Sequence, residues 1–150
     1  MTDLLLVRRF SADYLRNGVN LLVLVVVPAV FVVVAAPALG AASVLLGGAG
    51  STPVEAVTPG WAAGFLAAVA MYFQVSTARS ADVRLAQAGF PVVRIVAARL
   101  ATGAFIAVGV SAVALAALAA RTGAWAPRAV PGTIAFAVIY LGVGAGVAAT

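Results

Sequence analysis

The side chains that could perform acid–base, nucleophilic or metal chemistry are few in this chain and lie far apart. Four carboxylates occur, at Asp3, Asp13, Glu55 and Asp82, and His, Lys and Cys are absent. General acid–base catalysis needs titratable groups in one site, and a serine nucleophile needs a neighbouring base. Zinc and calcium sites need clustered His, Cys or carboxylate ligands. The sequence therefore predicts a chain with no catalytic site and no metal site.

Nucleotide and nucleic-acid binding are also disfavoured by the composition. A P-loop needs the pattern GxxxxGK[ST], which a chain without Lys cannot form, so we expect no ATP site and no cofactor in this chain. The GVGAG run near the chain end does not match GxGxxG, and no strand is predicted before it. All nine cations are Arg and flank apolar runs rather than forming a basic face with aromatic residues, so no nucleic-acid partner is expected.

Four of the nine Arg residues lie in one stretch between two apolar segments, RSADVRLAQAGFPVVRIVAARL, at residues 79–100. Ser80 is placed to cap a short helix through DVRLAQA, Gly89 to end it and Pro91 to begin the next helix. A simple connection between two helices needs about 2 to 8 residues. The sequence therefore predicts a separate short helix here, larger than the connection alone requires.

The overall composition is that of a membrane protein. Hydrophobic residues make up 65% of the chain and charged residues 9%, against about 25% charged in soluble domains, and the mean hydropathy is +1.17. Four apolar runs have the length expected of helices that cross a hydrocarbon core of about 30 Å. They are residues 19–40, 61–77, 100–120 and 131–150. We therefore expect an all-α fold, a multi-pass transmembrane helical bundle of about four spans preceded by an interfacial amphipathic helix.

Proline and glycine add two expectations about the first half of the chain. Pro28 lies inside the first apolar run and is expected to kink it, which a membrane helix tolerates when its neighbours satisfy the freed carbonyl. Residues 47–60, GGAGSTPVEAVTPG, have the Gly, Pro, Ser and Thr content of a loop. We therefore expect a loop there, followed by a second span that begins near Trp61.

Residues 1–17 are too short and too charged to span a membrane, but they form two faces on a helical wheel. The apolar face holds Leu6, Val7, Phe10 and Tyr14, and the opposite face holds Arg8, Arg9 and Arg16. This pattern favours a helix lying in the membrane interface with its cations toward the headgroups, and a solvated N-terminal tail is the alternative. A cleavable signal peptide is disfavoured, because the following apolar run exceeds the usual length of about 7 to 15 residues.

The Arg residues are divided unevenly between the two sides of the expected bundle. Seven lie on the side of the N-terminus and of the connection between the second and third spans, and two lie on the other side. The first group is Arg8, Arg9, Arg16, Arg79, Arg84, Arg94 and Arg99, and the second is Arg121 and Arg128. The positive-inside rule then predicts a multi-pass protein of the cell (plasma) membrane with its N-terminus in the cytoplasm and the loop around Glu55 outside. Arg94 and Arg99 are expected at the membrane edge, with hydrated guanidinium groups.

The interiors of the expected spans contain no charged residue, which argues against a transporter or channel that depends on buried charges. Four uncharged polar side chains remain as candidates to line a translocation path: Tyr72, Gln74, Ser111 and Tyr140. The alternative is that they form hydrogen bonds between helices. Small residues at four-residue spacing predict close helix packing. They are Gly60, Gly64 and Ala68 in the second span and Gly142 and Gly146 in the fourth.

In the order of its parts, the chain resembles the membrane permeases of ATP-binding-cassette (ABC) exporters of the ABC-2 type. The shared features are an interfacial helix, a first span, an external loop with TPGW leading into the second span, and a cytoplasmic helix with the sequence RLAQAGFPVVRIVAARL. The resemblance covers most of the chain, but ARSADVR replaces the Glu-rich, Gly-Thr sequence common in the family. It implies an interfacial helix at residues 1–17 and a permease domain at 18–150 that holds the first four of six spans, so we expect a truncated chain or a fragment.

The resemblance implies a membrane-spanning permease subunit that exports an unidentified substrate by alternating access. A separate cytoplasmic ABC ATPase would hold ATP and Mg and supply the energy, and a second permease copy or a related permease would complete a dimer in the lipid bilayer. A helix near residues 81–89 would be the coupling helix that contacts the ATPase. Its residues are Ala81, Asp82, Arg84, Leu85, Gln87 and Gly89. The alternative is a small four-span structural or assembly protein without transport activity, in which residues 79–99 are only a charged anchor.

Overall fold

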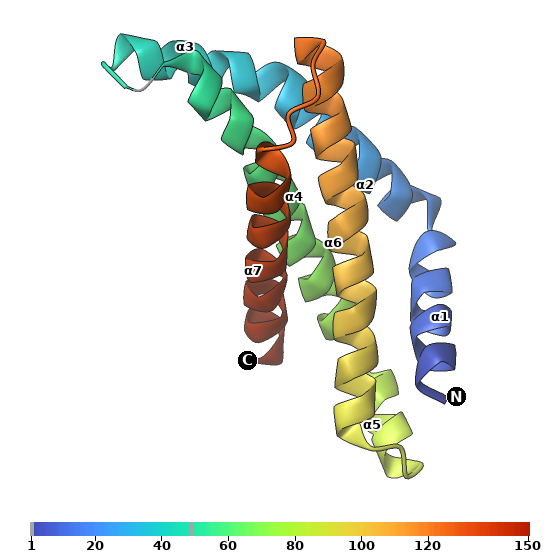
Figure 1. Cartoon of the computed structure of the whole chain (residues 1–150). Helices are drawn as coiled ribbons and strands as arrows, with labels where there is room; N and C mark the ends of the chain where they lie inside the picture. Colours follow the sequence, from blue (N-terminus) through green and yellow to red (C-terminus); the bar gives the residue numbers. More distant parts are fainter. Residues whose placement is uncertain (1, 49) are drawn as a thin grey trace.

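The computed structural model describes residues 2–48 and 50–150, with side chains from Leu5 onward, and its regular structure over those ranges is helical, without a strand (Figure 1). The elements are α1 (Thr2–Leu15), α2 (Gly18–Val30), the π-helical η1 (Phe31–Ala35), α3 (Ala36–Leu45), α4 (Ser51–Ser76), α5 (Arg79–Gln87), α6 (Val92–Thr122) and α7 (Ala129–Ala149). Four segments are long and apolar enough to cross a membrane: Gly18–Leu45, Ser51–Gln87, Val92–Thr122 and Ala129–Ala149. The predicted all-α fold, with four such segments after a short first helix, is confirmed.

Helices α2 and α3 and the π-helical η1 form the first of these segments, and its regularity is broken where two prolines remove backbone donors. Asn17 begins the segment, since its side-chain oxygen accepts hydrogen bonds from the backbone N–H groups of Val19 and Asn20 at 3.1 and 3.4 Å. The π-helical turn lies between Pro28 and Pro37, neither of which can donate a backbone hydrogen bond. The direction of the segment changes between α2 and α3, so the kink expected at Pro28 is spread over the following residues (Figure 1).

The surface of the first segment is mostly open. Only 17% of its apolar 18-residue stretch is buried against the rest of the bundle. An apolar surface of this extent is costly in water but favourable against acyl chains. The chain is therefore a membrane-embedded helical protein, with its first segment lying against one side of the other helices.

The second segment begins earlier than the sequence suggested, because α4 already starts at Ser51. The expectation of a loop through residues 47–60 is therefore wrong over most of its length. Pro59 lies inside α4 and cannot donate to the carbonyl four residues before it, but the hydroxyl of Thr58 donates to this carbonyl of Glu55 at 2.6 Å. The helix therefore continues through the proline without leaving that carbonyl unpaired.

The predicted short helix between the second and third segments is present as α5, two residues earlier than expected. It follows directly on helical backbone at Ala78 and has no side-chain cap, so Ser80 lies within its first turn and is not the cap. The chain turns at Gly89, whose φ of +89° is unfavourable for a residue with a Cβ. Pro91 then precedes the first residue of α6, where its missing N–H costs nothing.

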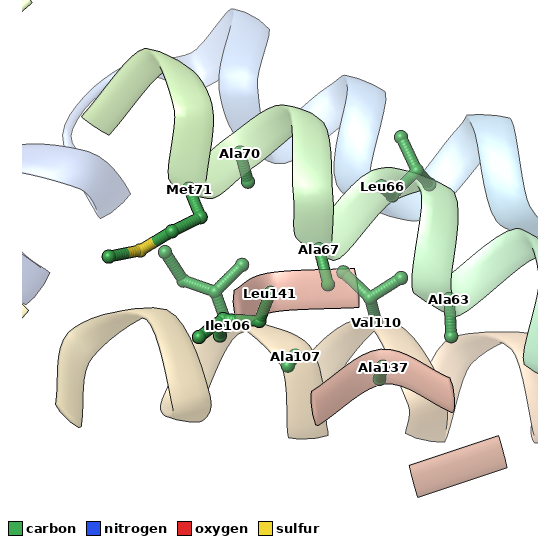
Figure 2. Close-up of a cluster of buried hydrophobic side chains, with 10 residues drawn as sticks. All are labelled: Ala63, Leu66, Ala67, Ala70, Met71, Ile106, Ala107, Val110, Ala137 and Leu141. Carbon is green, nitrogen blue, oxygen red and sulfur yellow. The ribbon is translucent and has the colours of Figure 1, made fainter. Parts of the chain in front are cut away.

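Helices α4, α6 and α7 pack around a shared core of mostly small side chains (Figure 2). Its buried members are Ala63, Leu66, Ala67, Ala70, Met71, Ile106, Ala107, Val110, Ala137 and Leu141. Half of these ten residues are Ala, so the helix backbones approach closely. Close approach of this kind is how membrane helices gain packing energy in the absence of a hydrophobic drive from water.

The small residues singled out in α4 face α7, whereas the two glycines singled out in α7 do not face α4. Gly60 and Gly64 are buried, and a Cβ on Gly64 would lie 3.3 Å from the ring of Tyr140. Gly142 and Gly146 are exposed, and a Cβ on either would meet no atom within 4 Å. This second pair therefore does not pack against another helix of the chain, and the sequence pattern named no partner for it. The glycine of α7 that faces α4 is Gly144, which lies midway between them in the sequence and on the other side of the helix.

The two ends of the bundle differ in charge. Figure 1 shows the N-terminus and α5 at one end, and the turns that join α3 to α4 and α6 to α7 at the other. We call the end formed by α1, α5 and the first turns of α6 the Arg-rich end. These elements hold six of the nine Arg residues: Arg8, Arg9, Arg79, Arg84, Arg94 and Arg99. Six of the seven Arg residues expected together therefore lie at this end, whereas Arg16 lies in the turn between α1 and α2. The side of the membrane stays a prediction.

An added methyl group at Gly144 tests the contact between α4 and α7. A Cβ there would overlap the backbone carbonyl of Ala68, so Gly144→Ala must push the two helices apart. We expect a loss of about 1–3 kcal/mol of unfolding free energy, measured as a lower thermal midpoint of the protein in detergent. Gly142→Ala is the matched control, because its Cβ meets nothing, and its midpoint should stay the same or rise slightly. Equal midpoints for the two variants would contradict the packing.

Candidate functional site

At the Arg-rich end, an ion pair joins α5 to α6. The Nε and Nη2 atoms of Arg99 donate to Oδ2 and Oδ1 of Asp82, each at 2.6 Å. The side chain of Arg99 is 9% exposed and that of Asp82 is 24% exposed, so the pair is largely shielded from solvent. Paired hydrogen bonds between a guanidinium and a carboxylate fix orientation as well as distance. The short helix α5 is therefore held in a defined position on α6.

Two further contacts occupy the guanidinium of Arg99. Its Nη1 donates to the backbone carbonyl of Gln74 in α4 at 3.3 Å, and its central carbon lies 4.4 Å from the centroid of the Phe10 ring in α1. The expectation of a hydrated guanidinium at the membrane edge is therefore wrong for Arg99, because protein groups replace the water around it. From α6, this one side chain contacts α1, α4 and α5.

A cavity of about 730 Å³ opens beside this ion pair, between α1, the start of α2, the end of α4, α5 and α6. Its apolar walls are formed by Leu6, Phe10, Phe73 and Leu85. Its charged lining is formed by Arg9, Asp13, Arg84 and Arg99. This volume lies within the range of roughly 300–1,000 Å³ typical of ligand sites. Apolar walls with a charged rim suit a molecule that is itself part apolar and part charged.

Two uncharged polar side chains on the cavity wall bear on what it can hold. Gln74 is 9% exposed, and its Oε1 is buried without a hydrogen-bond donor. An unsatisfied buried acceptor costs about 1–3 kcal/mol of stability. Burial raises the pKa of the Tyr14 phenol above its ordinary value of 10.0, so this group is neutral and able to donate at physiological pH.

The residues predicted for the coupling helix lie on α5 or in the turn after it, but they differ in their surroundings. The carboxylate of Asp82 is bound by Arg99, and Leu85 is half-buried on the cavity wall. The exposed members are Ala81, Arg84, Gln87 and Gly89. Neither Asp82 nor Leu85 is therefore presented outward, and contact of α5 with another subunit stays a prediction.

The exposed apolar residue of α5 was not singled out by the sequence. Val83 is 52% exposed, although it lies in the sequence between Asp82, which Arg99 binds, and Leu85, which is half-buried. The sequence also assigned Arg9 to the headgroup-facing side of α1, whereas this residue lines the cavity. A helical wheel contains the signal for Val83, because it falls opposite the inward residues of α5. Nothing local to α1 indicates that Arg9 would meet a cavity formed by four other elements.

The four candidates for a translocation path lie in separate places. Gln74 lines the cavity, whereas Ser111 is buried and donates at 2.7 Å to a carbonyl of its own helix. Tyr140 stacks on Phe136 along α7 with ring centroids 5.9 Å apart, and Tyr72 is 40% exposed on α4. The contacts recorded for the described residues join none of the four to another. A path lined by these residues stays a prediction.

At the end opposite to α5, Arg121 forms an ion pair with Glu55 and joins α6 to α4. Helix α3 passes close to the same carboxylate, since a Cβ on Gly40 would lie 3.0 Å from Oε1 of Glu55. Three helices therefore meet at this side chain. No cluster of three or more acidic or other metal-ligating residues occurs in the part of the chain that the structure describes.

No protein-family model, curated protein or solved structure matches the chain. The resemblance to ABC-2 permeases therefore depends on the order of the helices and on the short sequences quoted above. Function has to be inferred from the distribution of charge, from α5 and from the cavity beside it.

Removing the carboxylate at position 82 tests how much the ion pair stabilises the Arg-rich end. Asp82→Asn leaves the Arg99 guanidinium in a largely buried position without its counter-charge. We expect a loss of about 3 kcal/mol of unfolding free energy, at the lower end for a buried pair because Asp82 is partly exposed. Denaturation in detergent would measure it. Asp13→Asn removes an exposed carboxylate and should change little, and similar losses for both variants would contradict a specific role for the pair.

Proposed function

We propose that the chain is the membrane-spanning permease portion of an ABC exporter, driven by ATP hydrolysis in a separate cytoplasmic subunit. The observation that supports this most directly is α5, a helix of nine residues at the Arg-rich end between the second and third membrane-spanning segments (Figure 1). A helix there is more than the connection needs. It is also the place where the permeases that this chain resembles contact their ATPase.

The proposed orientation follows from the charge of the two ends. The Arg-rich end would lie in the cytoplasm and the turn between α3 and α4 outside the cell, because cytoplasmic connections of membrane proteins are enriched in cations. The ATPase would then reach α5 from the cytoplasm and would hold ATP and Mg, for which this chain has no P-loop. A second permease copy would complete the translocation unit.

Helix α5 is suited to transmit a displacement. Its outward face presents the exposed Val83, an apolar group of the kind that protein contacts bury. Its inward face is tied through Asp82 to Arg99 of α6. Movement of the ATPase against Val83 would therefore be passed to α6, and α6 packs in the core against α4 and α7. Alternating access needs such a link between a nucleotide-driven subunit and the spans.

Cysteine labelling tests the orientation, and the absence of native Cys keeps the background low. Ala88 and Ala124 are exposed and lie at opposite ends of the bundle. We expect Ala124→Cys to react in intact cells with a membrane-impermeant maleimide, and Ala88→Cys to react only after the membrane is opened. Labelling of Ala88→Cys from outside would reverse the proposed orientation.

Photo-crosslinking at the outward face of α5 tests the partner. A photoreactive amino acid replaces Val83 in cells that express the full-length protein, with Leu46 at the opposite end as the control position, since it is 86% exposed. We expect an ATPase with a P-loop peptide, identified by mass spectrometry, to crosslink at position 83 and not at position 46. Val83→Glu should reduce the co-purified ATPase activity at least about tenfold, because it places an unpaired charge in an apolar contact.

A matched substitution separates loss of contact from loss of fold. Ala124→Glu introduces the same charge at an exposed position of the opposite end and should leave ATPase co-purification unchanged. Both variants should keep the thermal midpoint of the unaltered chain. If no ATPase crosslinks at position 83 and Val83→Glu is silent, α5 is a charged anchor of a structural or assembly protein, and the proposal fails.

A further inference from the structure

We propose that the cavity beside the Arg99–Asp82 ion pair is a binding site for one anionic phospholipid, whose phosphate is held by Arg9 and Arg84 and whose apolar part lies against the walls from α1, α4 and α5. The proposal does not depend on the proposed exporter function. It rests on the charge, the walls and the position of the cavity.

The charged lining favours an anion. Arg99 is already engaged by Asp82, so this pair adds no net charge to the cavity. Arg9 and Arg84 remain, and neither has an ion-pair partner among the residues whose side chains are described. Against the single carboxylate of Asp13, two cations leave a net charge of +1 (2 − 1). Guanidinium groups bind phosphate with paired hydrogen bonds, which makes Arg a frequent phosphate ligand.

The walls favour an amphiphile over a free anion. Leu6, Phe73 and Leu85 present apolar surface from three different helices to the same space. A free phosphate would leave this surface in water, whereas an acyl chain or glycerol backbone would cover it. The neutral phenol of Tyr14 adds a donor for a headgroup oxygen.

The position of the cavity favours a lipid of the surrounding membrane. It lies where the apolar segments α2, α4 and α6 meet the charged elements α1 and α5, which is the level at which headgroups meet acyl chains. Arg side chains at this level reach phosphates while their stems stay in apolar surroundings. A phospholipid entering from the side can therefore place its phosphate at the cations without crossing a polar barrier.

Native mass spectrometry of the full chain in a neutral detergent tests the site. Delipidated protein is titrated with phosphatidylglycerol or with phosphatidylcholine that has the same acyl chains. We expect one phosphatidylglycerol to bind about tenfold more tightly than phosphatidylcholine. The choline group of phosphatidylcholine carries a positive charge, which cancels the charge of its phosphate and is repelled by the two Arg residues. Arg9→Gln and Arg84→Gln should each lower the phosphatidylglycerol affinity about three- to tenfold and leave phosphatidylcholine unchanged. Arg128→Gln removes an equal charge outside the cavity and should have no effect.

One further measurement distinguishes a lipid site from a site for free phosphate. Inorganic phosphate should fail to displace the lipid at millimolar concentration if the apolar walls contribute. Equal binding of the two lipids, equal effects of Arg128→Gln and Arg84→Gln, or full displacement by inorganic phosphate would each overturn the proposal. A silent Val83→Glu would leave it standing, since that variant tests only the ATPase contact.

Discussion

The ion pair between Arg99 and Asp82 is the contact on which the Arg-rich end depends. A guanidinium among apolar helices is stable only if its donors are occupied, and here a carboxylate of α5 and a carbonyl of α4 occupy them while a ring of α1 covers its face. Other contacts support the same arrangement, since Tyr14 of α1 packs against the core and Nη2 of Arg79 in α5 donates to the carbonyl of Ala148 in α7 at 2.5 Å. Burial of the Arg99 charge therefore helps to fix the positions of α1 and α5, and the cavity lies between them.

The packing of α4 against α7 is organised by the size of side chains rather than by charge. Helices α4 and α7 approach until Gly144 lies against the backbone of Ala68, and Gly64 lies under the ring of Tyr140. Packing of this kind tolerates no added atoms on either backbone but needs no polar contact. The bundle therefore has a closely packed core of α4, α6 and α7, to which α5 is joined by the Arg99–Asp82 ion pair and by the hydrogen bond from Arg79 to the carbonyl of Ala148. Any functional movement of α5 would occur against this core.

The sequence predicted those features that depend on composition and local pattern. Apolar runs in the sequence indicate the four segments, and the positions of Gly and Pro indicate the short helix between the second and third. The positions of the Arg residues indicate their division between two ends. The start of α4 was missed because Pro59 indicates a break unless one knows that Thr58 satisfies the freed carbonyl. The burial of Arg99 was missed because its partner lies 17 residues away on another helix, and the sequence alone gives no reason to pair them. Gly144, which faces α4, was not identified because the spacing of small residues selects a face of α7 without indicating which helix that face meets.

The cavity and the outward face of α5 are linked through the same short helix. Arg84 and Leu85 line the cavity, Val83 points away from it, and Asp82 holds all three at a fixed place on α6. A ligand that contacts Arg84 stabilises this place of α5, and so does a partner that binds Val83 with α5 in the same place. By linkage, each must then raise the affinity of the other by the same factor. If instead the partner binds α5 after it has moved, the two must weaken one another, because the cavity loses the wall that carries Arg84 and Leu85. A lipid in the cavity and a partner on Val83 would therefore be coupled through the position of α5, which the Arg99–Asp82 ion pair helps to fix on α6.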